Sequence, residues 1–199
     1  MVKGKKGQIT ILEQAKVEGA EKMKVKQKMK EAYAIWVFSW LIWHSTKSGK
    51  IDYSKLPMNF SIESENGAIT FKTDIPSTER EKLALNTVIA TTGICFTAFD
   101  SAIDEAFSKC DKTLPAQTTG LSAARVIVKQ IRNAYAHDPL HPKWVIGNPN
   151  HRKTFQISEI GLAINLDDLN GHDFRVEDIN GSVGLAKLLN YCLDNVTDE

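Results

Sequence analysis

Apolar residues recur every three or four positions along three long stretches of the chain, a spacing that places them on one face of an α-helix. These stretches cover about residues 12–45, 77–110 and 121–138. In the first, Gly19 is the expected point of division, because glycine costs about 1 kcal/mol in a helix interior. The pattern predicts a mainly α fold.

Lysine stands at every second position over residues 22–30. A strand would gather these lysines on one basic face, whereas a helix would align Lys22, Lys26 and Lys30 on one side. The flanking Glu, Ala, Met and Gln residues favour the helix. Such a surface suits an RNA backbone, and solvation explains it equally well.

The same helical stretch then becomes apolar around its circumference. Trp36, Trp40 and Trp43 fall at i, i+4 and i+7 and therefore stack on one side. Large aromatic residues at this spacing form a core or a subunit interface more often than a base-stacking platform. We expect this helix to be buried on most sides, within a bundle or between subunits.

The second helical stretch begins near residue 77, where Thr78 and Glu81 have capping-box spacing. Its expected core face contains Leu85, Val88, Thr92, Cys95, Phe99, Ala102 and Ala106. Near its far end, Asp100, Asp104 and Glu105 have no histidine at ligand spacing. These acids therefore predict a solvated face rather than a metal site.

The third helical stretch has the clearest core face, an arc of about 120° at 100° per residue. The arc contains Leu121, Ala124, Ile127, Val128, Ile131 and Tyr135. Arg125 and Arg132 lie on one flank beside it, where an arginine stem packs and its head can face a cleft. Lys129 and Asn133 lie further round, and Pro139 ends the helix.

Shorter alternating patterns predict strands. Residues 59–73 alternate around a Glu-Asn-Gly turn and predict a hairpin, and residues 154–160 and 162–166 predict two further strands. A last helix carries an apolar stripe formed by Leu185, Leu188, Leu189, Cys192 and Val196. We therefore expect a single domain, residues 1–199, built as a helical bundle with small β-hairpin additions.

Charge is unevenly distributed along a chain whose formal net charge is +1. Residues 1–31 form a basic arm with nine Lys against four Glu, a balance of +5, and residues 158–199 have a balance of −7 from nine acids and two bases. This distribution fits three interpretations: contact with nucleic acid at the basic end, association of the basic end of one chain with the acidic end of another, or two solvated surfaces. With 199 residues, 42% of them apolar, the chain can bury a core without metal or disulfides.

Cysteine use and the N-terminal sequence predict a cytoplasmic protein. The three cysteines are far apart and fit neither a disulfide framework nor a thiolate zinc site. The first lysines are not followed by the apolar run of a signal peptide. The apolar residues 35–43 are too few to cross a bilayer, so we expect no membrane association.

The end of the third helix carries the candidate chemistry, in the run Arg132-Asn133-Ala-Tyr-Ala-His137. An arginine binds phosphate through a fixed fork of donors, and a histidine moves a proton near neutral pH. The run resembles the signature of the HEPN superfamily, in which Arg, often with a polar residue next to it, precedes His by four to six residues. Residues 154–199, a β-hairpin plus a helix, lie outside the minimal HEPN bundle.

The resemblance implies a helical bundle that dimerises so that two motifs face one cleft. Many HEPN proteins are metal-independent endoribonucleases, and many act as toxins or in phage defence. It implies that His137 is the general acid or base and that Arg132 stabilises charge on the phosphate. It also implies that Asn133 orients the side chain of either Arg132 or His137. It requires no cofactor or metal. The expected partners are RNA, a second copy and a cognate antitoxin or regulatory protein. The candidate RNA-binding residues are Arg125, Lys129, Lys22, Lys26 and Lys30.

Helical geometry complicates this assignment, because five positions along a straight helix separate Arg132 and His137 by about 140°. Either the last turn unwinds or a second subunit completes the site. Alternatively, Arg132 pairs with an acid and His137 caps the helix carbonyls. His141 is a second candidate, and His151 and His172 are expected at the surface.

Two other functions fit the same sequence. One is a non-catalytic HEPN-like dimer that binds RNA, a nucleotide or a protein partner. The other is an interaction scaffold built on the tryptophan face.

Overall fold

The computed structural model describes residues 25–55, 59–64, 67–72, 76, 78–108 and 118–196. This part of the chain is mainly helical, as the sequence predicts. Its α-helices are α2 (Val25–Lys47), α3 (Arg80–Ser108), α4 (Gly120–Tyr135), α5 (Leu166–Leu169) and α6 (Gly181–Asn195). Its strands are β1 (Asn59–Ser64), β2 (Gly67–Lys72), β3 (Thr154–Ile157) and β4 (Leu162–Asn165). Short 3₁₀ helices are η1 (Tyr53–Lys55), η2 (Pro149–His151), η3 (Ser158–Ile160) and η4 (Val176–Ile179).

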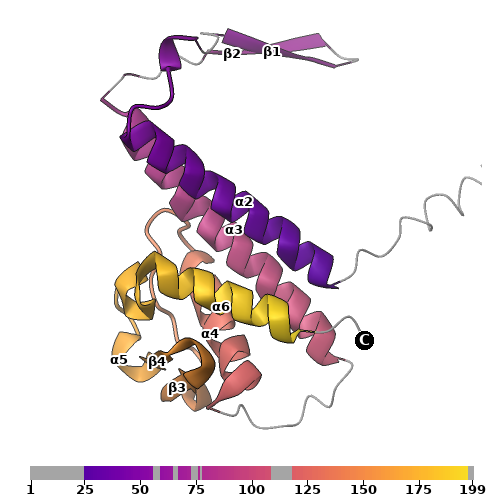
Figure 1. The fold of residues 1–199 in the computed structure, drawn as a ribbon, viewed down its shortest axis with the longest axis vertical. Coiled ribbons are helices and arrows are strands. Elements are labelled where there is room, and N and C mark those ends of the chain that lie inside the picture. Colours follow the sequence, from indigo (N-terminus) through magenta and orange to yellow (C-terminus); the bar gives the residue numbers. More distant parts are fainter. Residues whose placement is uncertain are drawn as a thin grey trace, which may run out of the picture.

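Helices α2 and α3 lie side by side, and the β1–β2 hairpin stands beyond one end of the pair (Figure 1). The predicted tryptophan stripe packs between these helices. The Trp36 indole is buried and donates from Nε1 to Thr92 Oγ1 at 3.0 Å. Trp40 and Trp43 follow it edge to face. The first part of the stripe is therefore a core, as expected, whereas the opposite side of α2 is open.

The expected core face of α3 is buried from Val88 to Ala102 and partly buried at Ala106, and its one exposed member is Leu85. This residue is exposed because it lines an open apolar groove of about 410 Å³ between α3, Trp40 and the segment around Phe174. The early turns of α3 therefore lack the cover that the periodicity predicts.

Helix α4 crosses α3 at a point of close backbone approach. A Cβ added at Gly93 would stand 2.9 Å from Tyr135 Cβ and Cδ1, so this contact requires glycine. The helix ends at Tyr135, earlier than predicted, because Asp138 Oδ1 accepts hydrogen bonds from the backbone of Leu140 and His141 at 3.0 and 3.1 Å. That local turn replaces the last helical turn before the proline.

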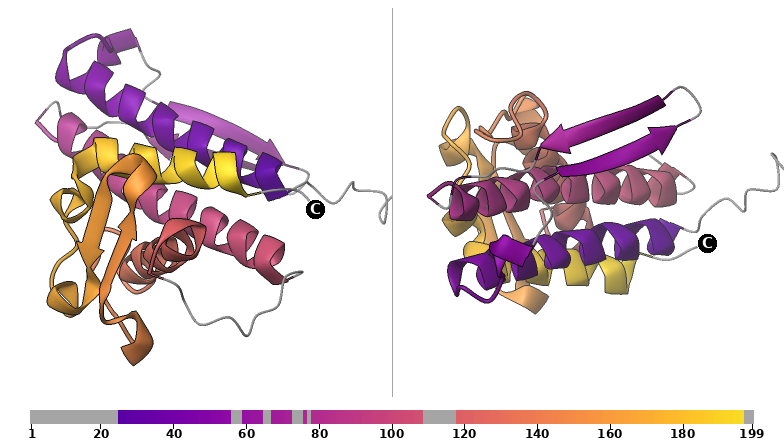
Figure 2. Two further views of the ribbon diagram at one scale, coloured as in Figure 1. Left: turned by 60° about the horizontal axis from the view of Figure 1, so that its bottom comes forward. Right: turned by 90° about the horizontal axis from the view of Figure 1, so that it is seen from above.

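The C-terminal third packs onto the same core. β3 pairs antiparallel with β4, and a parallel bridge joins Gln156 to Thr119 at the start of α4. The strands are shorter than predicted, because η3 and Gly161, with φ of 65°, make the turn between them. Helix α6 lies next to α2 and α4 (Figure 2). Its predicted apolar stripe is buried.

One helix of the described chain is long and apolar enough to span a membrane by length and composition alone. Residues 80–107 of α3 reach a mean hydropathy of 1.3 over their most apolar window, of which 44% is buried inside the molecule. The core helix of a folded domain passes the same test, and α3 packs between α2 and α4. The cytoplasmic location stays a prediction.

Candidate functional site at the end of helix α4

Arg132 lies on the last turn of α4 between two polar neighbours. Its Nη1 donates to Asn133 Oδ1 at 3.0 Å, and its Nε lies 3.8 Å from Asp100 Oδ2 on α3. The side chain remains 43% exposed. The guanidinium is thus held in direction by Asn133 and Asp100, while part of its donor fork still faces solvent.

Asp100 is buried, so the prediction of a solvated acidic face is wrong at this position. Its side chain is 11% exposed, because α4 lies over this side of α3. Burial raises the pKa of the Asp100 carboxyl, and the charge of Asp104 raises it further, whereas Lys129, Arg132 and Arg125 lower it. Asp100 Oδ1 has no hydrogen-bond partner within the described part of the chain.

The other predicted surface acids are also paired. Asp104 Oδ1 accepts from Arg125 Nη2 at 2.8 Å and from Nε at 3.0 Å, and Asp104 Oδ2 lies 3.8 Å from Lys129 Nζ. Glu105 pairs with Lys28 of α2 at 2.7 Å. These acids therefore join helices rather than face water alone. Within the described ranges, no three His, Cys, Asp or Glu residues form a group that could hold a metal ion.

His137 lies two residues beyond the end of α4 and is exposed. Among the described residues its side chain makes no hydrogen bond or ion pair, so the structure does not join it to Arg132 or to the helix carbonyls. The exposed His141 instead places Nδ1 3.1 Å from Asp138 Oδ2. The backbone N–H groups of Leu140 and His141 and the His141 ring hold the pKa of Asp138 below its usual range.

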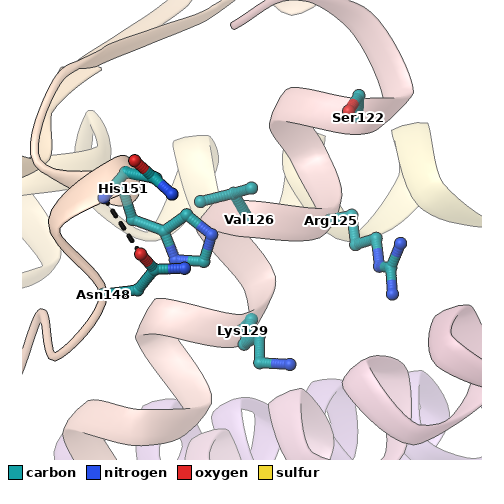
Figure 3. A pocket seen from close by; sticks show the side chains of 7 residues that line it. Ser122, Arg125, Val126, Lys129, Asn148 and His151 are labelled. Carbon is teal, nitrogen blue, oxygen red and sulfur yellow. Dashed lines mark hydrogen bonds between the residues drawn. The ribbon is translucent and has the colours of Figure 1, made fainter. Parts of the chain in front are cut away.

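The cations of α4 form a stripe beside a polar pocket. Arg125, Lys129 and Arg132 lie within an arc of about 60°, and the first two line a cavity of about 310 Å³. His151, on η2, closes the other side (Figure 3). It was expected at the surface, but its ring is half-buried and its Nδ1 lies 2.9 Å from Gln130 Nε2. Burial lowers the pKa of His151, and the charges of Lys129 and Lys153 lower it further.

The remaining candidate RNA-binding residues lie elsewhere. Lys22 is outside the described residues, and Lys26 and Lys30 lie on α2 and do not line the pocket. His172, like His137, is exposed.

Comparison with protein-family models, curated proteins and solved structures finds no match to this chain. The HEPN assignment therefore rests on the run from Arg132 to His137 and stays a prediction.

Proposed function

We propose that the protein is a metal-independent endoribonuclease of HEPN type that acts as a homodimer. The observation that carries the proposal is that two side chains remain accessible at the same end of α4. They are Arg132, which is oriented and half-exposed, and His137, which is exposed and makes no hydrogen bond among the described residues. A role as the toxin or effector of a toxin–antitoxin or phage-defence system belongs to the same proposal, with a cognate antitoxin or regulatory protein as partner.

The proposed reaction is attack of an RNA 2′-hydroxyl on the adjacent phosphate. His137 accepts the hydroxyl proton, the 2′-oxygen bonds to phosphorus, and the bond from phosphorus to the 5′-oxygen breaks. The products are a 2′,3′-cyclic phosphate and a 5′-hydroxyl whose proton comes from water. Arg132 of the partner subunit stabilises the charge that builds on the non-bridging oxygens. The scheme contains no metal or cofactor step.

Two features support a site shared between two copies. His137 lies two residues beyond the end of α4, and within the described part of one copy it makes no hydrogen bond with Arg132, whose partners are Asn133 and Asp100. The outer face of α2 also exposes large apolar side chains, with Ile35, Phe38 and Leu41 at 56%, 60% and 56%. An apolar surface of this kind is typical of a protein interface, and a second copy would cover it.

Cleavage in the absence of divalent metal tests the function. The protein, incubated with fluorescent RNA in EDTA, is expected to release products that end in a cyclic phosphate. The His137→Ala variant should lose this activity and keep the circular-dichroism spectrum of the wild type. His172→Ala is the matched control, since His172 is also an exposed loop histidine. Equal cleavage by the wild type and His137→Ala would refute the proposal.

A second candidate is a non-catalytic HEPN-like dimer that binds RNA, a nucleotide or a protein partner. The contact between Arg132 and Asp100 favours it, because a carboxylate competes with phosphate for the guanidinium. RNA binding that weakens steeply with salt, without any cleavage, would support this function instead.

A further inference from the structure

The pocket beside α4 has a lining unlike that of the apolar groove on α3. Its six polar residues come from two separate segments, helix α4 and the loop that contains η2 (Figure 3). They are Ser122, Arg125, Lys129, Asn148, Asn150 and His151. A volume of about 310 Å³ is at the lower end of the range for small-ligand sites, roughly 300–1,000 Å³.

The two cations of the pocket both form ion pairs with Asp104. Arg125 is fixed by two hydrogen bonds to Asp104 Oδ1 and lies over the Phe107 ring, with 4.8 Å between Cζ and the ring centroid. Lys129 lies 3.8 Å from the other Asp104 oxygen and is 41% exposed. With Arg132 and Asp100 included, three cations face two acids, so the cluster retains positive charge. A further positive charge, that of Lys153 in the loop, is close enough to lower the pKa of His151.

The uncharged groups of the pocket add hydrogen-bond donors. Asn148 Oδ1 accepts from the Asn150 backbone N–H at 3.0 Å, which leaves its amide NH₂ as the remaining polar group. Gln130 Nε2 lies 2.9 Å from His151 Nδ1, and an amide NH₂ can donate to Nδ1 when the ring carries its proton on Nε2. In that tautomer Nε2–H is a donor, and burial, which lowers the pKa of His151, favours the neutral ring. Cations and donors together select an anion.

We propose that this pocket binds a phosphate group of the RNA strand, next to the phosphate that Arg132 contacts. The inference rests on the proposed function in taking RNA as the ligand. Its own support is the alignment of the cations: Arg125, Lys129 and Arg132 lie within about 60° of one another, and Lys129 is about 4.5 Å from Arg132 along the helix axis. A strand that reaches Arg132 along this face passes the pocket.

Titration with inorganic phosphate tests the pocket itself. Proton–carbon NMR follows the Cε1–H signals of the five histidines, assigned by single substitutions. Phosphate is expected to shift the His151 signal in the wild type and in Lys129→Arg, and to have at least tenfold lower affinity for Lys129→Gln. Lys187→Gln, which removes an exposed lysine from α6, should behave as the wild type. The absence of a His151 shift, or an equal response in Lys129→Gln, would overturn the proposal.

A 2′-deoxy oligonucleotide tests whether the bound phosphate belongs to a nucleic-acid strand. It lacks the attacking hydroxyl, so binding is measured without cleavage. A plot of log affinity against log salt concentration has a negative slope. In Lys129→Gln this slope should be smaller in magnitude by about 0.7, the value for one phosphate contact on a single strand. Lys187→Gln should leave the slope unchanged. A pocket that binds inorganic phosphate but shows no slope change would serve free phosphate, and the proposal would be wrong.

These results are separable from the test of the nuclease. A protein that cuts RNA in EDTA but shows no phosphate response at His151 refutes only the pocket. A protein that binds the oligonucleotide through Lys129 and cuts no RNA refutes only the nuclease.

Discussion

Thr92 connects the three helices that position the candidate site, and its replacement by valine is the most informative stability experiment. The Thr92 hydroxyl accepts from Trp36 Nε1 of α2 at 3.0 Å and donates to Val88 O at 2.8 Å. Burial raises the pKa of the Tyr135 phenol of α4, and the neighbouring Thr92 hydroxyl lowers it in part. Thr92 itself is 3% exposed. Valine has the same shape, so the substitution removes these hydrogen bonds and leaves little change in volume.

The expected cost follows from the buried Trp36 indole N–H, which loses its hydrogen-bond partner. A buried donor or acceptor left unsatisfied costs about 1–3 kcal/mol. The Trp36 indole N–H is deeply buried, and Tyr135 is nearly so. We expect Thr92→Val to lower the free energy of unfolding by about 1–3 kcal/mol, a large part of the roughly 5–15 kcal/mol typical of a folded domain.

Urea unfolding followed by tryptophan fluorescence measures this difference, provided that the m-value is unchanged. Thr97→Val is the matched control, because the Thr97 hydroxyl on the same helix bonds only to Gly93 O, at 2.8 Å, among the described residues. Its cost should stay within about 0.5 kcal/mol. A double-mutant cycle with Trp36→Phe should give a coupling of about 0.5–3 kcal/mol. Equal costs for the two valine variants would show that Thr92 does not join the helices.

Three further predictions concern packing and pH. Gly93→Ala should lower the free energy of unfolding, measured in urea, by up to about 2 kcal/mol, because the clash with Tyr135 exceeds the helix-propensity gain. Gly147→Ala, with no atom within 4 Å, should be near neutral in the same measurement. Asp100 has a raised folded pKa, so its ionisation opposes folding, and the wild type should lose stability relative to Asp100→Asn as pH rises from about 4. His151 has a lowered folded pKa, so the wild type should lose stability relative to His151→Asn as pH falls below about 6.5. A pH-independent difference in either pair would contradict the assigned shift.

The helical part of the fold follows from periodicity, because burial on one side of a helix leaves a local pattern in the sequence. The arc of α4 that contains Ile127 and Ile131 is buried as predicted, and so is the stripe of α6 that contains Leu188. The pattern gives no information on how far a neighbouring element extends. Leu85 keeps the period of a core residue and still lines an open groove.

The candidate site was only partly predictable for a similar reason. The motif from Arg132 to His137 is contiguous and could be recognised, whereas the groups around it come from distant segments. Asp100 is 32 positions before Arg132. The sequence around a helical carboxylate does not indicate which other helix will pack against it. His151 reaches the pocket through a contact with Gln130 that no sequence spacing indicates.

The measurement that tests the central claim most directly is complementation between two inactive variants. Arg132→Ala and His137→Ala are each expected to lose RNA cleavage. If one subunit supplies Arg132 and the other His137, mixed dimers regain one intact site of two, and an equal mixture, after exchange of subunits, should recover about a quarter of the wild-type activity. Activity that stays at the level of the separate variants, in mixtures shown to contain the mixed dimer, would contradict a site shared between subunits.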